Sequence, residues 1–292
     1  SPHMVLSIAD RYETIATAIA ASYLNIPVVH VQGGEVTGSI DEKVRHAVTK
    51  LANLHFVATQ QAADRVIRMG EDPDTVHVTG CPSIDLVARI MKEDEDGFDV
   101  YSEVGGSGVG HPFDTSEGFL VVMQHPVTTE HDAAAEQVEQ TLHAIHHMGM
   151  PSFWFWPNVD AGSDTTSAAI RRYREAHDPD HIYFLKNLSP ENFLRLLKRS
   201  CCIIGNSSVG IRECSFMGVP TVNIGSRQKR RERAENVLDV GYDEKAIIAA
   251  VEKHLANGAY TTSELYGNGA AGKRIVDILA TTLPGHDKQI TY

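Results

Sequence analysis

Short apolar runs alternate with longer amphipathic segments along most of the chain. The runs Phe-Leu-Val-Val-Met at 119–123 and Cys-Cys-Ile-Ile at 201–204 carry no polar face, which is typical of strands buried on both sides of a parallel sheet. The segments between such runs have apolar residues at helical spacing. This alternation predicts an α/β protein with helices on both faces of its sheets.

The pattern has two similar halves separated by a stretch of different composition. In the first half we expect four strands, at 4–9, 27–31, 55–59 and 76–79, and helices at 12–24, 41–51, 60–69 and 83–91. In the second half we expect strands at 119–123, 152–156, 182–185, 202–204 and 219–224. The second-half helices are expected at 133–148, 165–176, 190–199, 244–256 and 272–283, with another after residue 205.

The separating stretch is acidic and glycine-rich, with Glu-Asp-Glu-Asp at 93–96 and Gly-Gly-Ser-Gly at 105–108. Such composition predicts a linker and a domain boundary. We therefore expect an N-terminal Rossmann-like domain at 1–92, a linker at 93–117 and a C-terminal nucleotide-binding domain at 118–292. The last helix is a candidate for packing back on the first domain. Because the first half lacks an opening βαβ unit, we expect the N-terminal domain to be incomplete.

Two Rossmann-like halves place a ligand in the cleft between them, at the carboxyl ends of the strands. The formal net charge of −12 argues against a partner that is nucleic acid or an acidic membrane surface. No apolar run approaches the roughly 20 residues of a membrane span. The four cysteines fit neither a disulfide framework nor a zinc site, so we expect a reduced, cytoplasmic setting.

The stretch from Gly205 to Glu213 follows a predicted buried strand and leads into a predicted helix. Backbone N–H groups at the turn, the amide of Asn206 and the hydroxyls of Ser207 and Ser208 are donors suited to an anion, and a helix dipole favours negative charge there. Glu213 is suited to accept hydrogen bonds from a sugar. This pattern predicts a nucleotide-sugar site; an ordinary strand-to-helix turn is the alternative.

Polar residues also follow the first two strands. Asp10 and Arg11 are candidates for an acid/base group and an anion clamp, although Asp10 is also suited to cap the following helix. Gln32 and Glu35 flank two glycines that permit close approach to a ligand, or that only form a turn. On the next predicted helix Arg45 and His46 are further candidates, although Asp41 and Arg45 also have the spacing of a surface ion pair.

In the second half, polar residues follow three strands. His125 lies after the strand at 119–123, where Pro126 stiffens the turn, and we expect it to titrate near neutral pH, with a merely structural histidine as the alternative. Asp160 lies in an acceptor-rich segment suited to bind a sugar or to turn the chain. Arg227 begins the cluster Arg-Gln-Lys-Arg-Arg, which is either a diphosphate clamp or a solvated charged loop.

Together these stretches resemble the hydrolysing UDP-N-acetylglucosamine 2-epimerases of sialic-acid biosynthesis. The resemblance runs from near residue 5 to about 270. The motifs that carry it are the following, in chain order: 30–41 with 45–51, 80–85, 124–129, 158–163, 205–213, and 225–228 with 231–232 and 235–238.

The resemblance implies a fold like that of the GT-B glycosyltransferases, with neither metal nor NAD, and a homodimer or homotetramer. It implies that UDP is eliminated from UDP-N-acetylglucosamine to give a 2-acetamidoglucal, to which water adds, yielding N-acetylmannosamine and UDP. By position, the implied UDP binders are Arg11, Ser207, Ser208, Glu213 and Arg227, and the implied catalytic groups are Asp10 and His125.

The chain departs from the family in two places. The family often has Glu where this chain has Gln32, and a neutral amide cannot serve as a base, so Asp10 or Glu35 must take more of that role. The family's opening Gly-Thr-Arg-Ala-Asp-Tyr loop has no counterpart here. Three alternatives stay open: a relative acting on a UDP- or GDP-linked 2,4-diacetamido sugar, a catalytically impaired nucleotide-sugar binding module, and a retaining glycosyltransferase.

Overall fold

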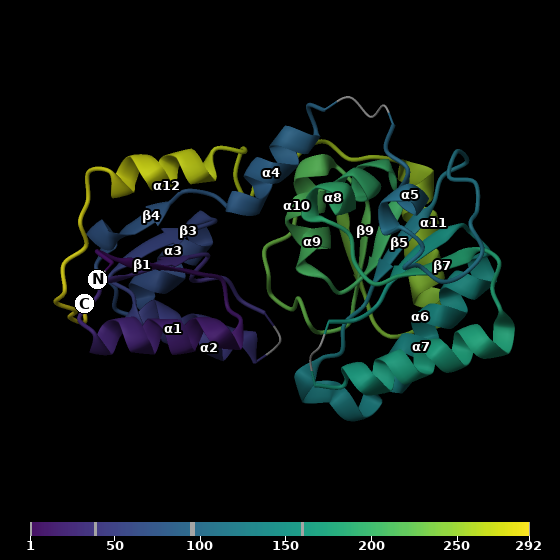
Figure 1. Cartoon of the computed structure of the whole chain (residues 1–292), viewed down its shortest axis with the longest axis horizontal. Coiled ribbons are helices and arrows are strands. Elements are labelled where there is room, and N and C mark those ends of the chain that lie inside the picture. Colours follow the sequence, from purple (N-terminus) through teal and green to yellow (C-terminus); the bar gives the residue numbers. More distant parts are fainter. Residues whose placement is uncertain (1, 38–39, 94–96, 159–160, 292) are drawn as a thin grey trace. The chain divides into compact units, whose positions relative to one another are not determined.

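The structure is a computed structural model that describes residues 2–37, 40–93, 97–158 and 161–291. The chain forms two compact units (Figure 1). The first consists of Ser1–Ala88 with Glu264–Tyr292, and the second of Arg89–Ser263.

The first unit is built on a four-stranded parallel sheet in the order β1-β2-β3-β4. Its strands are β1 (Val5–Ile8), β2 (Val28–Val31), β3 (Leu54–Val57) and β4 (Val76–Val78). Its helices are α1 (Tyr12–Tyr23), α2 (Asp41–Leu51), α3 (Gln60–Arg68), the 3-10 turn η1 (Pro73–Thr75), α4 (Pro82–Ile90) and α12 (Ala271–Leu279).

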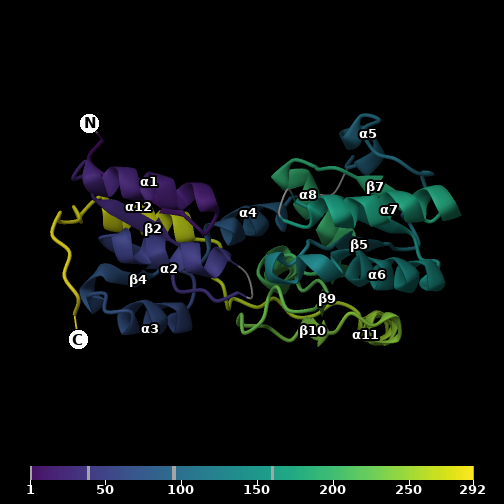
Figure 2. The ribbon, with the colours of Figure 1, turned by 90° about the horizontal axis from the view of Figure 1, so that it is seen from below.

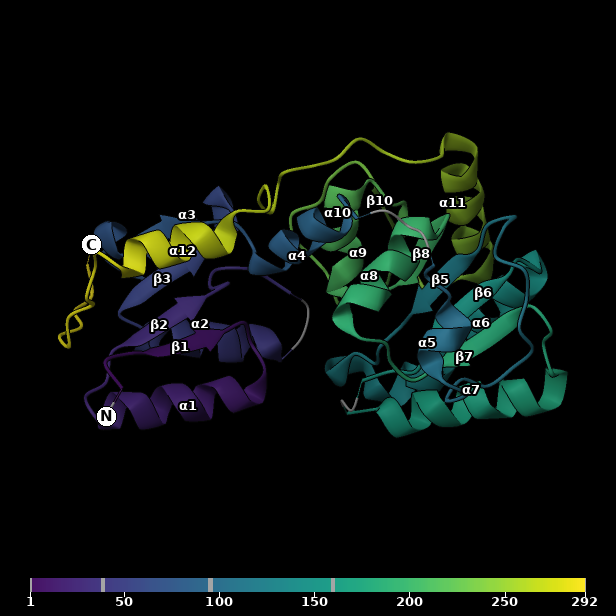
Figure 3. The same ribbon diagram turned by 45° about the horizontal axis from the view of Figure 1, so that its top comes forward.

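Alternation along β2 sends its side chains into two separate cores. Val28 packs with Ala18 of α1 and Val48 of α2, whereas its neighbour Val29 packs with Ile275 of α12. Successive side chains of a strand point to opposite faces, so α12 covers the face opposite to α1 and α2. Figures 1 and 3 show α12 and α1 on opposite sides of this sheet.

The second unit is built on a six-stranded parallel sheet in the order β10-β9-β8-β5-β6-β7. Its strands are β5 (Leu120–Met123), β6 (Ser152–Phe155), β7 (Ile182–Leu185), β8 (Cys202–Gly205), β9 (Thr221–Ile224) and β10 (Val237–Val240). Its helices are α5 (Val100–Val104), the 3-10 turn η2 (Thr128–Ala133), α6 (Ala134–Met148), α7 (Ser163–His177), α8 (Pro190–Arg199), α9 (Ser208–Ile211), α10 (Glu213–Met217) and α11 (Glu244–Asn257).

Apolar side chains from both surfaces of the second sheet are fully buried. Leu120 and Val122 of β5 join Trp154 and the inward faces of α6 and α7 in one core. Figure 2 shows α6 and α7 side by side, and the two helices share many contacts. Within the described part of the chain, no helix has the length and apolar character needed to cross a bilayer.

The structure differs from the sequence-based expectation between residues 97 and 117. This segment belongs to the second unit and contains α5, although we expected a linker. Tyr101 packs on Phe153 and Tyr183, with ring centroids 5.7 and 5.0 Å away, and Val109 pairs with Phe184 in an antiparallel bridge. These apolar contacts order a segment whose glycines and acidic residues indicated a loop.

Two further elements differ from expectation. Strand β10 was not predicted, because it is an edge strand of which no residue is fully buried, so it lacks a continuous apolar run. The last helix, expected at 272–283, ends at Leu279; it packs in the first unit, which is the placement that we named as a candidate.

Gly205 provides a test of how tightly β5 and β8 fit together. Its φ is +138°, and a Cβ there would lie 2.0 Å from the carbonyl oxygen of Met123, whereas a Cβ at Gly149 (φ +61°) meets nothing within 4 Å. We expect Gly149→Ala to cost about 1 kcal/mol, for the positive φ alone. Gly205→Ala should cost at least about 3 kcal/mol, since it adds a clash with backbone.

Denaturant unfolding followed by tryptophan fluorescence measures this difference, because both tryptophans, Trp154 and Trp156, lie in the second unit. Equal losses of unfolding free energy in the two variants would contradict the close approach of β8 to Met123.

Candidate functional site

The candidate site of the second unit forms where its strand order reverses. The connection from β5 leads to β6 on one side, whereas β8 lies on the other side of β5, and Met123 pairs in register with Gly205. Open α/β sheets bind their ligands outside the carboxyl ends of strands at such a switch point. His125 follows β5 and Asn206 follows β8, so both predicted residues lie there.

Asn206 joins the two turns. Its Oδ1 accepts from the backbone N–H of His125 at 2.7 Å, and its Nδ2 donates to the His125 carbonyl oxygen at 2.8 Å. The residue is fully buried. Because both ends of the amide are engaged, we assign Asn206 a positioning role in place of the predicted ligand contact.

His125 is buried, and its Nδ1 accepts from the backbone N–H of Asn158 at 3.1 Å. Burial, together with the positive charge of Arg227, lowers the pKa of His125 to about 3. The expectation that it titrates near neutral pH is therefore wrong, because burial disfavours the charged ring. With Nδ1 accepting, the neutral ring carries its proton on Nε2, which makes Nε2 a hydrogen-bond donor.

Arg227 lies beside the same turn. Its Nη1 donates to the carbonyl oxygen of Asn206 at 3.2 Å, and Nε2 of the buried Gln228 donates to the same oxygen at 2.9 Å. Lys229 and Arg230, the next two residues, are exposed. The basic cluster therefore divides into Arg227 at the turn, the solvated Lys229 and Arg230, and the buried Arg231, whose Nη1 donates to Gln228 Oε1 at 3.0 Å.

Glu130 of η2 holds the loop that carries Arg227. Its carboxylate accepts from the hydroxyl of Ser226, from Nε2 of Gln137 at 2.8 Å and from the hydroxyl of Tyr242 at 3.4 Å. We did not single out Glu130, Gln228 or the N–H of Asn158 from the sequence. Asn158 and Gln228 belong to the motifs at 158–163 and 225–228, and Glu130 directly follows the motif at 124–129, but no sequence pattern indicated their roles, which depend on partners distant in the chain.

Ser207 and Ser208 follow Asn206 in the turn after β8. Ser207 Oγ accepts from the Val209 N–H at 3.4 Å, and Ser208 Oγ accepts from Arg212 Nη2 at 3.1 Å. Both hydroxyl oxygens act as acceptors, so both hydroxyl hydrogens can donate to an anion. The predicted continuous helix is instead broken at Arg212, and α9 is only four residues long. The turn therefore offers an anion these hydroxyl donors rather than the dipole of a long helix.

Glu213 begins α10 and is 6% exposed. Its Oε1 lies 3.6 Å from Arg212 Nη2. Its Oε2 has no hydrogen-bond partner among the residues that the structure describes. A buried carboxylate oxygen without a donor is costly, which makes this atom a strong acceptor for a ligand hydroxyl.

In the first unit, the carboxyl ends of β1 and β2 carry a second cluster. Arg45, whose side chain is 1% exposed, pairs with the Asp10 carboxylate and donates from Nη1 to the Glu35 carbonyl oxygen at 2.7 Å. Asp10 does not cap α1, whose N-cap is Arg11 without a side-chain cap bond. Arg45 is buried rather than on the surface, so we assign it to positioning Asp10 instead of the predicted substrate contact.

His30 fixes the backbone directly before Asp10. Its Nε2 donates to the Ala9 carbonyl oxygen at 3.0 Å and its Nδ1 accepts from the Thr49 hydroxyl at 3.1 Å. Burial lowers the pKa of His30 to about 4, so the ring is neutral. Ala9 has φ +62°, and this contact holds it directly before Asp10. Buried Gln32 donates from Nε2 to Cys81 Sγ at 2.7 Å.

Of the remaining predicted residues, Arg11 and His46 take no part in these contacts, and Asp160 is not among the residues that the structure describes. Arg11 is exposed beside Glu13 at 3.3 Å, and His46 lies 3.4 Å from Glu42 on α2. In the described ranges, no group of three or more His, Cys, Asp or Glu side chains has the arrangement of a metal site.

Comparison with known proteins places the chain in one family. The model of the UDP-N-acetylglucosamine 2-epimerase family matches residues 1–280. A UDP-N,N′-diacetylbacillosamine 2-epimerase (hydrolyzing) of Legionella pneumophila is 36% identical over 288 residues, which are 99% of this chain and 73% of that protein. A UDP-N-acetylglucosamine 2-epimerase of Neisseria meningitidis is 30% identical over 268 residues, 92% of this chain and 67% of that protein.

A solved structure shares the fold. The UDP-GlcNAc 2-epimerase of Methanocaldococcus jannaschii, in complex with UDP-GlcNAc and UDP, matches with a TM-score of 0.78 at 22% identity, over 96% of this chain and 76% of that one. The prediction of two Rossmann-like units of parallel sheet is confirmed. With a family model matched from residue 1 to residue 280, the chain belongs to the UDP-N-acetylglucosamine 2-epimerase family.

Proposed function

We propose that this protein is a hydrolysing nucleotide-sugar 2-epimerase that converts UDP-N-acetylglucosamine and water to N-acetylmannosamine and UDP. The observation that carries the proposal is the buried Oε2 of Glu213, which no described group satisfies, beside a turn with two donating hydroxyls. A nucleoside diphosphate has the complementary groups, since its ribose hydroxyls donate and its phosphates accept. The N. meningitidis relative is named for UDP-N-acetylglucosamine.

In this proposal the second unit binds UDP. Ser207, Ser208 and Arg227 contact the diphosphate, and Glu213 accepts from the ribose. Arg227 suits this role because a guanidinium matches phosphate oxygens with two parallel N–H bonds. Glu130 and Gln228 hold the Arg227 loop in place.

The reaction begins with loss of the C2 proton to the Asp10 carboxylate. The electrons of the C2–H bond form the C1–C2 double bond, and the C1–O bond breaks to release UDP. Water then adds across the double bond, with its oxygen at C1 and a proton delivered to C2 on the opposite face. That C2 proton is weakly acidic, so a closely positioned carboxylate base is required.

Two other residues take supporting roles. His125, neutral and protonated on Nε2, donates to the departing diphosphate, where negative charge grows. Gln32 is an amide and does not act as a base, so buried Glu35 is the second carboxylate candidate in the first unit.

A second candidate substrate is UDP-N,N′-diacetylbacillosamine. The L. pneumophila relative named for that substrate is 36% identical, against 30% for the relative named for UDP-N-acetylglucosamine. The two substrates share the UDP and the 2-acetamido group, so the same residues serve both, and they differ at the sugar's 4- and 6-positions.

Turnover tests the proposed reaction. We expect release of UDP and of the free 2-epimeric sugar from one or both substrates, and the higher kcat/KM identifies the preferred one. The GDP-linked sugars serve as a comparison for base preference. Asp10→Asn should lower kcat by about 100-fold or more, because it removes the base, while UDP affinity changes less than about twofold.

Glu13→Gln, at an exposed position nearby, is the matched control and should leave kcat unchanged. Nucleotide binding without release of UDP from any of these sugars would leave a binding module and reject the epimerase.

Removal of Arg227 tests the diphosphate contact. Arg227→Ala should weaken UDP binding about 10- to 100-fold, the loss of two charge-assisted hydrogen bonds. Lys229→Ala removes an exposed cation from the same loop and should change the affinity by less than about twofold. Isothermal titration calorimetry with UDP compares them, and equal effects would place the diphosphate away from Arg227.

The proposed contact between Glu213 and the ribose is tested with a UDP analogue that lacks the ribose hydroxyls. Wild-type protein should bind UDP roughly tenfold more tightly than UDP lacking the 2′ and 3′ hydroxyls, because the analogue cannot donate a hydrogen bond to the ionised Glu213 carboxylate. In Glu213→Gln this preference should shrink to about threefold or less. Exposed Glu235→Gln is the control. An unchanged preference in Glu213→Gln would show that the ribose lies elsewhere.

A further inference from the structure

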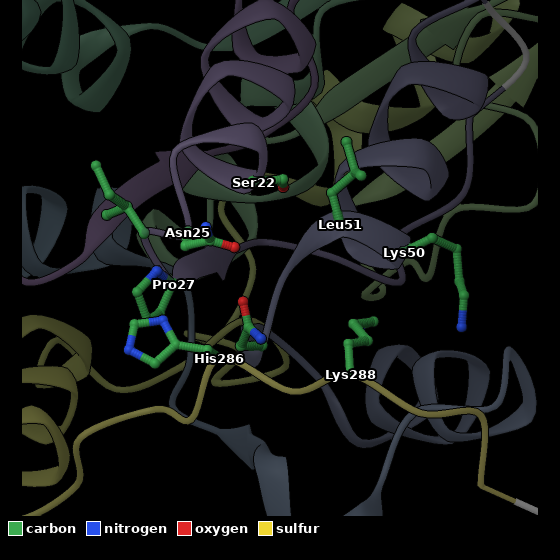
Figure 4. Close-up of a pocket in the computed structure, with 9 residues that line it drawn as sticks. Ser22, Asn25, Pro27, Lys50, Leu51, His286 and Lys288 are labelled. Carbon is green, nitrogen blue, oxygen red and sulfur yellow. The ribbon is translucent and has the colours of Figure 1, made fainter.

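A hollow of about 210 Å³ lies in the first unit at the amino ends of its strands, whereas Asp10 and Gln32 lie at the carboxyl ends. Pro27 and Asn53, which line it, precede β2 and β3, whereas Asp10 and Gln32 follow the carboxyl ends of β1 and β2. The end of α2 and the C-terminal segment form its other walls. Figure 4 shows Lys50 of α2 near Lys288, and His286 near Pro27. Nothing in the proposed epimerase reaction uses this hollow.

The lining is cationic in a chain of net charge −12. It includes Lys50, Lys288 and His286, and no carboxylate is among the residues that form it. Both lysines contact the carboxylate of Glu71, which is 3% exposed: Lys50 at 2.6 Å through Oε1, and Lys288 through Oε2.

The positive charges around the Glu71 carboxylate outnumber its single negative charge. His55 also donates to Glu71, at 2.9 Å from Oε2, and burial lowers the pKa of His55, so its ring is neutral. Burial alone would raise the pKa of Glu71, but the hydrogen bonds from His55, Lys288 and Lys50 lower it to about 2. Two ammonium groups therefore share one carboxylate, and one positive charge is left over at the wall of the hollow.

Lys50 and Asn53 have hydrogen-bond donors that remain for a ligand. The Lys50 ammonium has three N–H bonds, of which one reaches Glu71 and one the Met69 carbonyl oxygen at 3.0 Å. The third has no acceptor in the described structure. Asn53 Oδ1 accepts from the Val28 N–H at 3.1 Å, which leaves its NH₂ group as the donating end. Lys288 is held by Glu71 and by the Ala52 and Thr49 carbonyl oxygens, so it contributes charge.

We propose that this hollow binds a small oxyanion, a phosphate or carboxylate group, through Lys50 and Asn53, with the charge of Lys288 and the ring of His286 at its sides. Such an anion balances the excess positive charge. The volume suits a phosphate ion or a small phosphorylated or carboxylated molecule, because drug-sized ligands occupy roughly 300 Å³ or more. Since Lys288 and His286 belong to the C-terminal segment, the anion also holds that segment against α2.

Calorimetric titration with inorganic phosphate tests the site. Lys50→Gln should raise the phosphate Kd about tenfold, through loss of a charge-assisted hydrogen bond. Lys43→Gln makes the same change at an exposed position of the same helix, and we expect a Kd within about twofold of wild type. Arg227→Ala should leave this Kd unchanged, which separates the site from the proposed nucleotide site.

Because Lys50 also pairs with Glu71, its loss can weaken the fold, so His286→Ala is a second variant at an exposed position. It should raise the phosphate Kd roughly threefold to tenfold. Titrations with acetate and malonate show whether the occupant is a phosphate or a carboxylate. The proposal is overturned if sodium chloride at equal ionic strength reproduces the phosphate heat, if both variants bind phosphate like wild type, or if Arg227→Ala abolishes binding.

Discussion

The reciprocal hydrogen bonds between the Asn206 amide and the His125 backbone are the constraint on which the second unit's site depends. A fully buried amide is stable there only while both turns keep their positions, because a lost partner leaves a buried polar group unsatisfied. The backbone carbonyl oxygen of Asn206 also accepts hydrogen bonds from the side chains of Arg227 and Gln228. One residue thus aligns the loops after β5, β8 and β9, and brings a neutral imidazole and a guanidinium to the same turn.

Buried polar groups have the same role in the first unit. His30 holds the backbone at Ala9, and Arg45 joins the Asp10 carboxylate to the carbonyl oxygen of Glu35. A buried ion pair adds little net stability, since desolvation offsets much of the attraction. Its value here is orientation, because Asp10 lies on a loop, and the base role that we propose for Asp10 requires supports that fix the carboxylate to within a fraction of an ångström.

Most strands and helices could be predicted because their apolar runs are continuous and turn residues bound them. The failures have local causes. The edge strand β10 is only partly buried, so its pattern is weak. Around α5, glycines and acidic residues concealed Tyr101, whose contacts with Phe153 and Tyr183 order the segment. The helix after Ser208 breaks at Arg212, and no glycine or proline stands at that position to indicate it.

For the candidate site, the sequence by itself determined which residue types follow which strands: Asp10, Gln32, His125, Asn206 and Arg227 were all identified in this way. Only the tertiary structure decided what each does. His125 and Asn206 are 81 positions apart and Asp10 and Arg45 are 35 apart, so no local pattern reveals their contacts. Burial and partner geometry arise from those contacts. They make Asn206 and Arg45 supports, keep His125 neutral, and leave Glu213 with an oxygen available to a ligand, because the cost of an unsatisfied buried group depends on everything packed around it.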